Sequence, residues 1–484
     1  MRRSFVATRI VGWIGLAIAI GIVVFQVFVP PSIGLADNGD FGKISLKFHL
    51  RVPYDPSMPK GSPYIHLHWV FAPESSWHSG FHSAETLLVN VARPLNRLIS
   101  SAGTFDLRCL GAVHAALFLV AFAFFVPLTG AVRPALQATV LAVAIFFFCD
   151  AMYSTYYNSF YMDAAAFVFL MLALVFLVRA ARPREHGPGD AWAAVLFSVL
   201  MLTSKSQHAP LAIPLIVFVL WKRRAMWRRH ALLASVAAVS LLAGGAAYSL
   251  IEGTPPGYAN PCLFNIIFAR LLPTAENPSA ELASLGLDDS YLEFMGMNSY
   301  APEAPLLRKN YWAKEFLGRT SFPLLARFYI LHPARALSVA GGDLREAARQ
   351  RPLRQGLGSV GNYEPSAGYP PYAESNAFAA WSAAKRAALE SCPWLYPLLF
   401  AIALGIVAWA HPAGGVALGL MEALEFGLSG MTDSVEVTRH LFFFNAIWDV
   451  TVFAAVCVLV LGLNARLKRR SGKDGPAQPA EQAG

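Results

Sequence analysis

The chain has 484 residues, of which 56% are hydrophobic and only 14% charged, and its formal net charge is +9. Long apolar runs with few charges recur from one end to the other, which excludes an ordinary soluble enzyme and indicates a polytopic membrane protein. The basic residues lie mostly beside these runs, so they indicate orientation in a membrane and give no reason to expect a nucleic-acid partner.

Ten apolar segments predict a polytopic α-helical protein with about 10 transmembrane helices. Most of them approach the length of about 20 residues that crosses the hydrocarbon core. The fifth and sixth are short, so they form either two full spans or a re-entrant hairpin with both ends on one side. The segments are Val11–Val29, Leu107–Leu128, Pro134–Cys149, Met162–Val178, Ala191–Leu202, Ala209–Trp221, Ala231–Ile251, Trp394–Ala410, Val416–Gly430 and Phe442–Leu463.

The basic residues predict that both termini are cytoplasmic. With the N-terminus inside, seventeen Lys and Arg residues fall in cytoplasmic segments, whereas the short outer connections carry only Lys205 and Arg439. This is the charge distribution that orients membrane proteins.

The chain is predicted to divide into four parts. They are a transmembrane module at 1–251 with a first outer loop at 30–106, an extracytoplasmic helical domain at 252–393, C-terminal transmembrane helices at 394–463, and a basic, disordered cytoplasmic tail at 464–484.

Apolar periodicity predicts the helices of the outer segments. In the first loop, Ala84–Ile99 has amphipathic spacing. Residues 355–376 are rich in Gly, Pro and Tyr and predict a surface loop. The helices predicted for the extracytoplasmic domain are Cys262–Leu271, Phe322–Leu331, Pro333–Arg349 and Ala377–Leu389.

Two of the five cysteines, Cys262 and Cys392, stand at the two ends of the large outer loop. An extracytoplasmic location permits disulfides, so a bond between them would close the domain. Spacing alone leaves two free thiols as the alternative.

Polar motifs fall on the same predicted face of the membrane in four separate connections. Asp37 and Asp40 follow the first apolar segment, and Tyr153–Asp163 joins the third to the fourth. Thr203–His208 forms the tip of the short pair, and Thr432–His440 joins the last two segments. A transporter would place such groups near the bilayer midplane, so this clustering at one rim favours an outward-facing site.

Each motif also has an ordinary structural interpretation. The tyrosines could form an interfacial belt, Asn158 and Asp163 could cap a helix, and Arg439 could join a solvated loop ion pair. Lys205 is harder to explain in this way, because a cation at the tip of a short pair favours an anionic partner such as phosphate. Glu422 and Glu425 lie one turn apart within an apolar segment, and intramembrane carboxylates often have a function.

Placed on this topology, the motifs resemble the GT-C class of integral-membrane glycosyltransferases. "DNGDFGK", from Asp37 to Lys43, aligns without gaps with the acidic motif Asp-Glu-x-His-Phe-Gly-Lys of the protein O-mannosyltransferase branch. Asn38 replaces the Glu and Asp40 replaces the His. The chain is also similar to the bacterial hexosyltransferases of S-layer and other surface glycans in "GLADNGDF", "YYNSFYMD", "SKSQHAP", "LGLDDSYLEFMG", "HPARAL" and "RHLFFFN".

The resemblance implies an inverting enzyme of the cytoplasmic (inner) membrane whose site faces the periplasm or exterior. It would transfer a hexose from a polyprenyl-phosphate donor to a glycan or lipid-linked acceptor. Asp37 is then the expected catalytic base, with Asp40 as its neighbour or alternative. The candidate phosphate ligands are Lys205, His208, Arg439 and His440, and the candidate sugar or acceptor ligands are Asn158, Tyr157, Tyr161, Asp163 and Gln207.

The sequence requires no cofactor. Some enzymes of this class use a divalent metal, but the histidines of the first outer loop complete no ligand signature. Two alternative functions stay open: an O-antigen ligase or polymerase, which would not need the acidic motif, and a transporter or flippase, for which Glu422 and Glu425 are the best support.

Overall fold

The computed structural model describes residues 2–473 except 31, 38, 54–64, 73–78, 101–102, 131, 183–186 and 351–377. All ten predicted apolar segments are helical. They correspond to α1 (Arg2–Phe28), α4 (Arg108–Phe125), α5 (Pro134–Phe148), α7 (Asp163–Ala180), α8 (Pro188–Leu202), α9 (Ala212–Trp227), α10 (Ala231–Ile251), α17 (Leu395–Ala410), α18 (Pro412–Ser429) and α20 (Phe442–Lys473).

Five helical stretches are long and apolar enough to cross a membrane, by length and composition, one of them formed by α4 and the 3-10 helix η2 (Val126–Thr129) that continues it. They are Val6–Phe28, Arg108–Thr129, Asp163–Ala180, Ala231–Ile251 and Phe442–Leu467. A chain in lipid must satisfy its backbone hydrogen bonds internally, which explains why such runs are helical. The span count of about ten and the orientation of the chain stay predictions.

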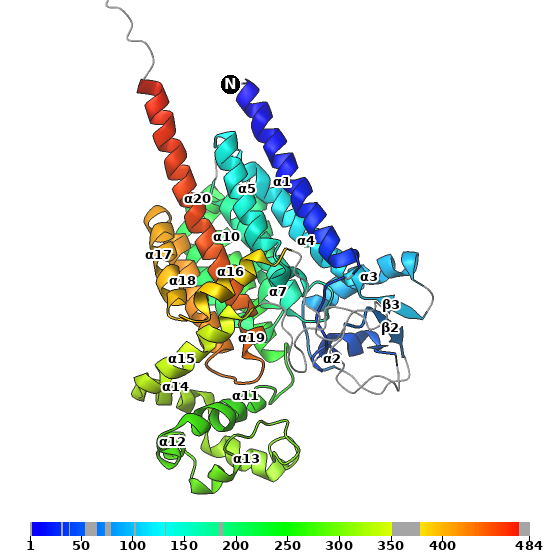
Figure 1. The fold of residues 1–484 in the computed structure, drawn as a ribbon, viewed down its shortest axis with the longest axis vertical. Helices are drawn as coiled ribbons and strands as arrows, with labels where there is room; N and C mark the ends of the chain where they lie inside the picture. Colours follow the sequence, from blue (N-terminus) through cyan, green and yellow to red (C-terminus); the bar gives the residue numbers. More distant parts are fainter. Residues whose placement is uncertain are drawn as a thin grey trace, which may run out of the picture.

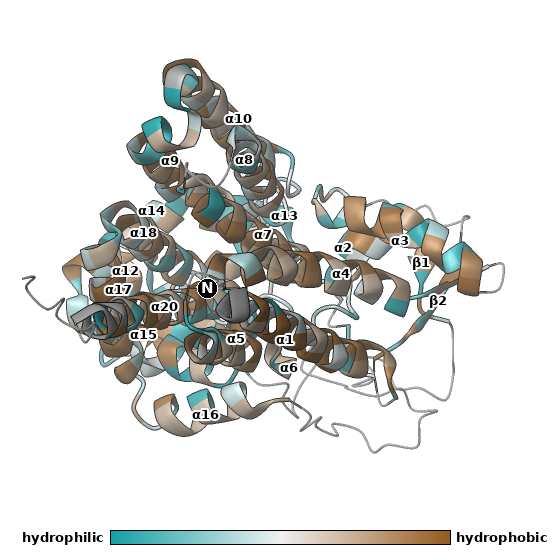
Figure 2. Cartoon of the chain, turned by 90° about the horizontal axis from the view of Figure 1, so that it is seen from above, coloured by the Kyte–Doolittle hydropathy of each residue, from teal (hydrophilic) through white to brown (hydrophobic). Residues whose placement is uncertain are grey.

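The helices pack into a bundle, with the start of α1 and the end of α20 at one end (Figure 1). The smaller helices between α10 and α15 lie at the opposite end. Seen from above, α7 lies between the group α8–α10 and the helices α1 and α4 (Figure 2). Its apolar window is 78% buried, against 28% for that of α10, so α7 is the most enclosed of the candidate spans, and α4, α8 and α20 pack against it.

The first outer loop contains the predicted amphipathic helix, α3 (Glu85–Ile99), with Pro94 inside it. It also contains an antiparallel sheet in the order β1-β2-β3, in which Leu50 pairs with Phe71 and Trp69 with Phe105. Sequence analysis did not predict this sheet. Its strands are β1 (Leu50–Arg51), β2 (His68–Phe71) and β3 (Thr104–Asp106), and the short helices α2 (Gly42–Ser45) and η1 (Leu46–Phe48) precede it.

The segment predicted as the outer domain has an apolar core of its own, in which leucines and isoleucines surround aromatic rings such as Phe264, Phe268 and Phe316. The four predicted helices are present here as α11 (Asn260–Phe264) continued by the π-helix η5 (Asn265–Leu271), α14 (Phe322–Leu331), α15 (Pro333–Ala348) and α16 (Ala380–Leu389). The elements that were not predicted are η6 (Leu272–Thr274), α12 (Pro278–Ser284), η7 (Asp289–Phe294) and α13 (Asn310–Arg319).

The end of the outer domain belongs structurally to the bundle. Leu344 of α15 and Leu389 of α16 share a core with Tyr396 of α17 and Trp448 of α20. The packing therefore crosses the boundary predicted at residue 393.

Two further expectations need correction. All five cysteines are free, so the Cys262–Cys392 disulfide is not formed. Helix α20 continues to Lys473, so the first ten residues of the predicted disordered tail are helical. The rest of the tail and the Gly/Pro/Tyr-rich segment at 355–376 lie outside the described residues.

Candidate active site

The acidic loop after α1 forms a tight turn around Asp37. Its Oδ1 accepts hydrogen bonds from the backbone N–H groups of Gly39 at 2.7 Å and Phe41 at 3.0 Å. Gly39 has a φ of +103°, which a residue without a side chain adopts without strain. Asp37 has no ion-pair partner among the described residues, and its side chain is part-exposed.

The turn between α6 (Ala151–Ser154) and α7 holds this loop in place. The Asn158 side chain donates to the carbonyl oxygens of Val27, at 3.0 Å, and Ile33, at 2.8 Å. The Tyr161 hydroxyl donates to the carbonyl of Ala36 at 3.0 Å. Asn158 and its neighbour Tyr157 are almost fully buried, so they position the site from behind and present no accessible surface to a sugar.

Arg439, on the short helix α19 (Val437–His440), lies at the centre of an ionic cluster. Its Nη2 is 2.7 Å from Asp40 Oδ2 and 2.8 Å from Glu436 Oε2, while its Nη1 is 3.9 Å from Asp163 Oδ2. The guanidinium lies 4.8 Å from the centre of the Tyr161 ring. One arginine thus joins the last outer connection to the first loop and to the start of α7.

Two lysines complete the cluster. Lys205, just before η3 (Ser206–Leu211), is 2.9 Å from Asp163 Oδ1. Lys43 is 2.6 Å from Asp40 Oδ1, donates to the Tyr258 hydroxyl, and lies 4.7 Å from the centre of that ring. Three cations therefore share the three carboxylates Asp40, Asp163 and Glu436.

A second group lies between η3 and α18. The Gln207 amide donates to Glu425 Oε1 at 2.6 Å, and His208 Nδ1 is 3.1 Å from Glu425 Oε2. Gln207 and His208 thus contact a carboxylate that is fully buried in α18. Glu422, one turn away, is buried, and neither of its carboxylate oxygens has a hydrogen-bond partner.

The two aspartates of the acidic loop titrate in opposite directions. Burial raises the pKa of Asp37 above the ordinary 3.8, and the two backbone N–H groups oppose this rise only in part. Burial would also raise the pKa of Asp40, but the charges of Arg439 and Lys43 hold it well below its usual range. Asp40 is therefore the carboxylate that stays ionised, while Asp37 is the better proton acceptor.

His440 was expected to be a phosphate ligand, but it is not a cation in this structure. Burial, followed by the charges of Arg439 and Lys205, lowers its pKa to about 3. The imidazole is therefore neutral near pH 7 in this structure, and it lies 3.8 Å from Asp433. It could donate a hydrogen bond to a phosphate, but it does not bring a positive charge.

Sequence analysis did not place Lys43 or Tyr258 in the site. Lys43 was visible as the last residue of the acidic motif. Glu436, the residue directly before α19, forms the loop ion pair with Arg439 that was the structural alternative. Tyr258 had no comparable signal, because 215 positions separate it from Lys43.

The described residues contain no group of three or more His, Cys, Asp or Glu side chains that could hold a metal ion. Asp40 and Asp163 are already paired with cations. The mechanism below is therefore derived from the described side chains alone.

A separate ionic cluster is buried inside the protein, where α16 meets α20. Lys385 Nζ donates to Asp449 Oδ1 at 3.0 Å and to Asn445 Oδ1 at 2.6 Å. Asp449 Oδ2 accepts from the Tyr153 hydroxyl at 2.5 Å and from Trp381 Nε1 at 3.0 Å. Lys385 is 3% exposed and Asp449 0%, so this cluster is closed to solvent.

The bundle of apolar helices defines a membrane protein with several transmembrane helices. The family model of the YfdI N-terminal transmembrane domain matches residues 2–478, and the chain therefore belongs to that family. No curated protein and no solved structure matches the chain.

Proposed function

We propose that this protein is an inverting glycosyltransferase that moves a hexose from a polyprenyl-phosphate donor to a surface glycan or lipid-linked acceptor outside the cytoplasmic membrane. The observation that carries the proposal is the clustering of Asp37, whose pKa is raised, near Lys43 of the same loop and near Arg439 and Lys205, which come from two other connections. Glycosyl transfer from a lipid phosphate needs both kinds of group. A carboxylate removes a proton from the acceptor, and cations stabilise the leaving phosphate.

Asp37 is the proposed base. Its carboxylate accepts the proton of the acceptor hydroxyl as that oxygen forms a bond to the anomeric carbon. The bond between the anomeric carbon and the phosphate oxygen breaks at the same time, and the polyprenyl phosphate leaves with the electron pair. A single displacement of this kind inverts the anomeric configuration.

Arg439 and Lys205 are the proposed phosphate ligands. An arginine binds a phosphate with two parallel hydrogen bonds, which suits a leaving group that gains negative charge. Among the three carboxylates around Arg439, Asp163 is the most distant at 3.9 Å, so a donor phosphate could replace it with the least loss. Asp40 keeps the guanidinium oriented and holds Lys43 beside it.

The proposal is tested with Asp37→Asn and Asp40→Asn in the full-length protein, by transfer of hexose from a polyprenyl-phosphate hexose to acceptor. Loss of a general base lowers the rate about 10²–10⁴-fold, which is the expectation for Asp37→Asn. The thermal stability of the Asp37→Asn variant should not fall, because the substitution replaces a charged group, whose burial is unfavourable, with a neutral amide. Asp289→Asn, at an exposed position of the outer domain, is the matched control and should retain activity.

Full transfer activity in both Asp37→Asn and Asp40→Asn would overturn the mechanism. Transport of the intact lipid-linked sugar across the membrane, without transfer, would favour the flippase alternative.

A further inference from the structure

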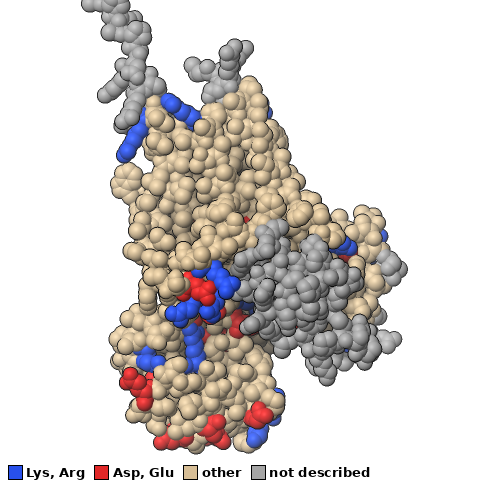
Figure 3. Space-filling view, in the orientation of Figure 1, with Lys and Arg blue, Asp and Glu red and all other residues tan. Residues whose placement is uncertain are grey.

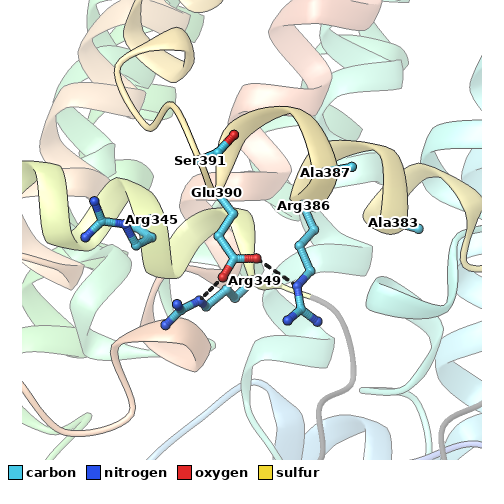
Figure 4. Close-up of a pocket in the computed structure, with 7 residues that line it drawn as sticks. All are labelled: Arg345, Arg349, Ala383, Arg386, Ala387, Glu390 and Ser391. Carbon is cyan, nitrogen blue, oxygen red and sulfur yellow. Dashed lines mark hydrogen bonds and ion pairs between the residues drawn. The ribbon is translucent and has the colours of Figure 1, made fainter.

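A pocket lined by four ionisable side chains lies away from the candidate active site, where α15 meets α16. Its volume is about 700 Å³, and its ionisable lining residues are Arg345, Arg349, Arg386 and Glu390. Three small residues complete the wall. Figure 4 shows Glu390 between Arg349 and Arg386, with Arg345 standing apart on α15.

The pocket holds more positive charge than its own carboxylate can balance. Glu390 Oε1 is 2.8 Å from Arg349 Nε, and Glu390 Oε2 is 2.9 Å from Arg386 Nε. One carboxylate is therefore divided between two guanidiniums. Arg345 is exposed and has no ion-pair partner among the described residues.

The pocket adjoins an apolar surface. Helix α17 follows α16 directly, and its outer end leaves Trp394 47% exposed, Leu398 54% and Ile402 54%. In Figure 3 blue and red side chains gather just below a continuous tan surface, at the level where Figure 1 places α15 and α16. Exposed tryptophan and leucine beside arginines are typical of the boundary between hydrocarbon and headgroups.

The pocket shares no residue with the cluster around Arg439. Glu346 connects the two: it accepts from the Thr438 hydroxyl at 2.8 Å and lies 2.5 Å from Arg349 Nη1. Helix α19 thus presents Arg439 to the candidate active site and Thr438 to Glu346 of α15.

We propose that this pocket binds the phosphate of a membrane lipid whose hydrocarbon chain lies along the exposed face of α17. A guanidinium offers the fork of donors that matches phosphate oxygens, and a site at the end of an apolar helix places the lipid chain in hydrocarbon. The phosphate can come from a glycerophospholipid or from a polyprenyl phosphate, since both join the same headgroup chemistry to an apolar chain. This inference does not depend on the proposed hexosyl transfer.

Native mass spectrometry of the full-length protein tests the proposal with three probes: phosphatidylglycerol, zwitterionic phosphatidylcholine and polyprenyl monophosphate. We expect retention of at least one of the two anionic lipids above that of phosphatidylcholine. Arg345→Gln should weaken it about fivefold, the effect of one basic residue at an anionic surface. Glu390→Gln should strengthen it, because the competing carboxylate is removed.

Arg327→Gln, at an exposed position of α14, is the matched control and should leave binding unchanged. The anionic lipid whose retention falls in Arg345→Gln is the source of the phosphate. A fall in the retention of either anionic lipid supports the site. Equal retention of all three lipids, or wild-type retention by Arg345→Gln with no gain in Glu390→Gln, would overturn it. Thermal unfolding of each variant separates lost binding from lost folding.

Discussion

Two ionic clusters in this molecule use the same kinds of side chain but differ in how completely they are satisfied. In the cluster of Lys385 and Asp449, hydrogen bonds occupy both carboxylate oxygens and the ammonium, and both side chains are almost fully buried. In the cluster of Arg439, the side chains of Asp40 and Arg439 keep 23% and 11% of their surface accessible. A ligand can reach the second cluster but not the first.

The difference separates a structural role from a chemical one. A closed and fully bonded pair offers nothing to a substrate, and it ties α16 to α20. An accessible cluster with an unpaired carboxylate, Asp37, beside it can exchange partners. A buried ion pair is therefore not by itself evidence of a functional site, and the accessibility of its polar groups decides.

The largest effect on stability is expected from Lys385→Met, which leaves Asp449 buried without its cation. Breaking a buried pair in this way costs about 3–5 kcal/mol. Thermal unfolding of the purified protein should show the loss, while the activity per folded molecule should stay close to wild type. The double variant Lys385→Met/Asp449→Leu should recover much of the stability, because no unpaired charge remains. If folded Lys385→Met lost transfer activity, the cluster of Lys385 and Asp449 would have a role in catalysis, and its assignment as a structural cluster would be wrong.

Arg439→Gln should lower the rate of transfer, in contrast to Lys385→Met, which should lower the stability. Removing one donor that stabilises charge in a transition state lowers kcat about 10²–10³-fold, or about 2.7–4 kcal/mol. Transfer kinetics measure this loss, and Arg439→Lys should restore it only in part, because an ammonium lacks the planar fork of donors. A wild-type kcat in Arg439→Gln would contradict the proposal that Arg439 binds the leaving phosphate.

The smallest effect is a displaced pH profile. Only ionised Asp37 can accept a proton, and burial raises its pKa, so kcat/KM should fall with decreasing pH at a value above 3.8. The pKa of Asp40 is depressed, so its contribution to stability is lost only as the pH falls below 3.8. Activity should therefore disappear before the fold does, as rate and tryptophan fluorescence measured together would show. Coincident loss of both would contradict the assignment of the base.

The helices were predictable because their signals are local. Each apolar segment carries its own hydropathy, and α15 and α16 carry their own periodicity. The sheet of the first loop was missed because β1 has two residues and β2 four, too few for a clear alternation. The packing of α16 on the bundle depends on Lys385 meeting Asp449, 64 positions away, which no local pattern reveals.

The site was predictable in part for a different reason. The predicted membrane topology places Asp40, Asp163, Lys205 and Arg439 on one side, even though the chain separates them widely. A topology does not say which side chains touch or which are buried. Only the packing shows that Asn158, Tyr157 and Tyr161 are all almost fully buried behind the loop.

The fastening of the acidic loop has a consequence for protein engineering. Asn158 and Tyr161 hold the loop through its backbone, and Phe41 packs edge-on against the rings of Phe160 and Tyr161. The loop at residues 32–43 therefore cannot be transferred to another protein by itself. A chimera that exchanges this loop should keep its geometry only if residues 158–161 are exchanged together with it.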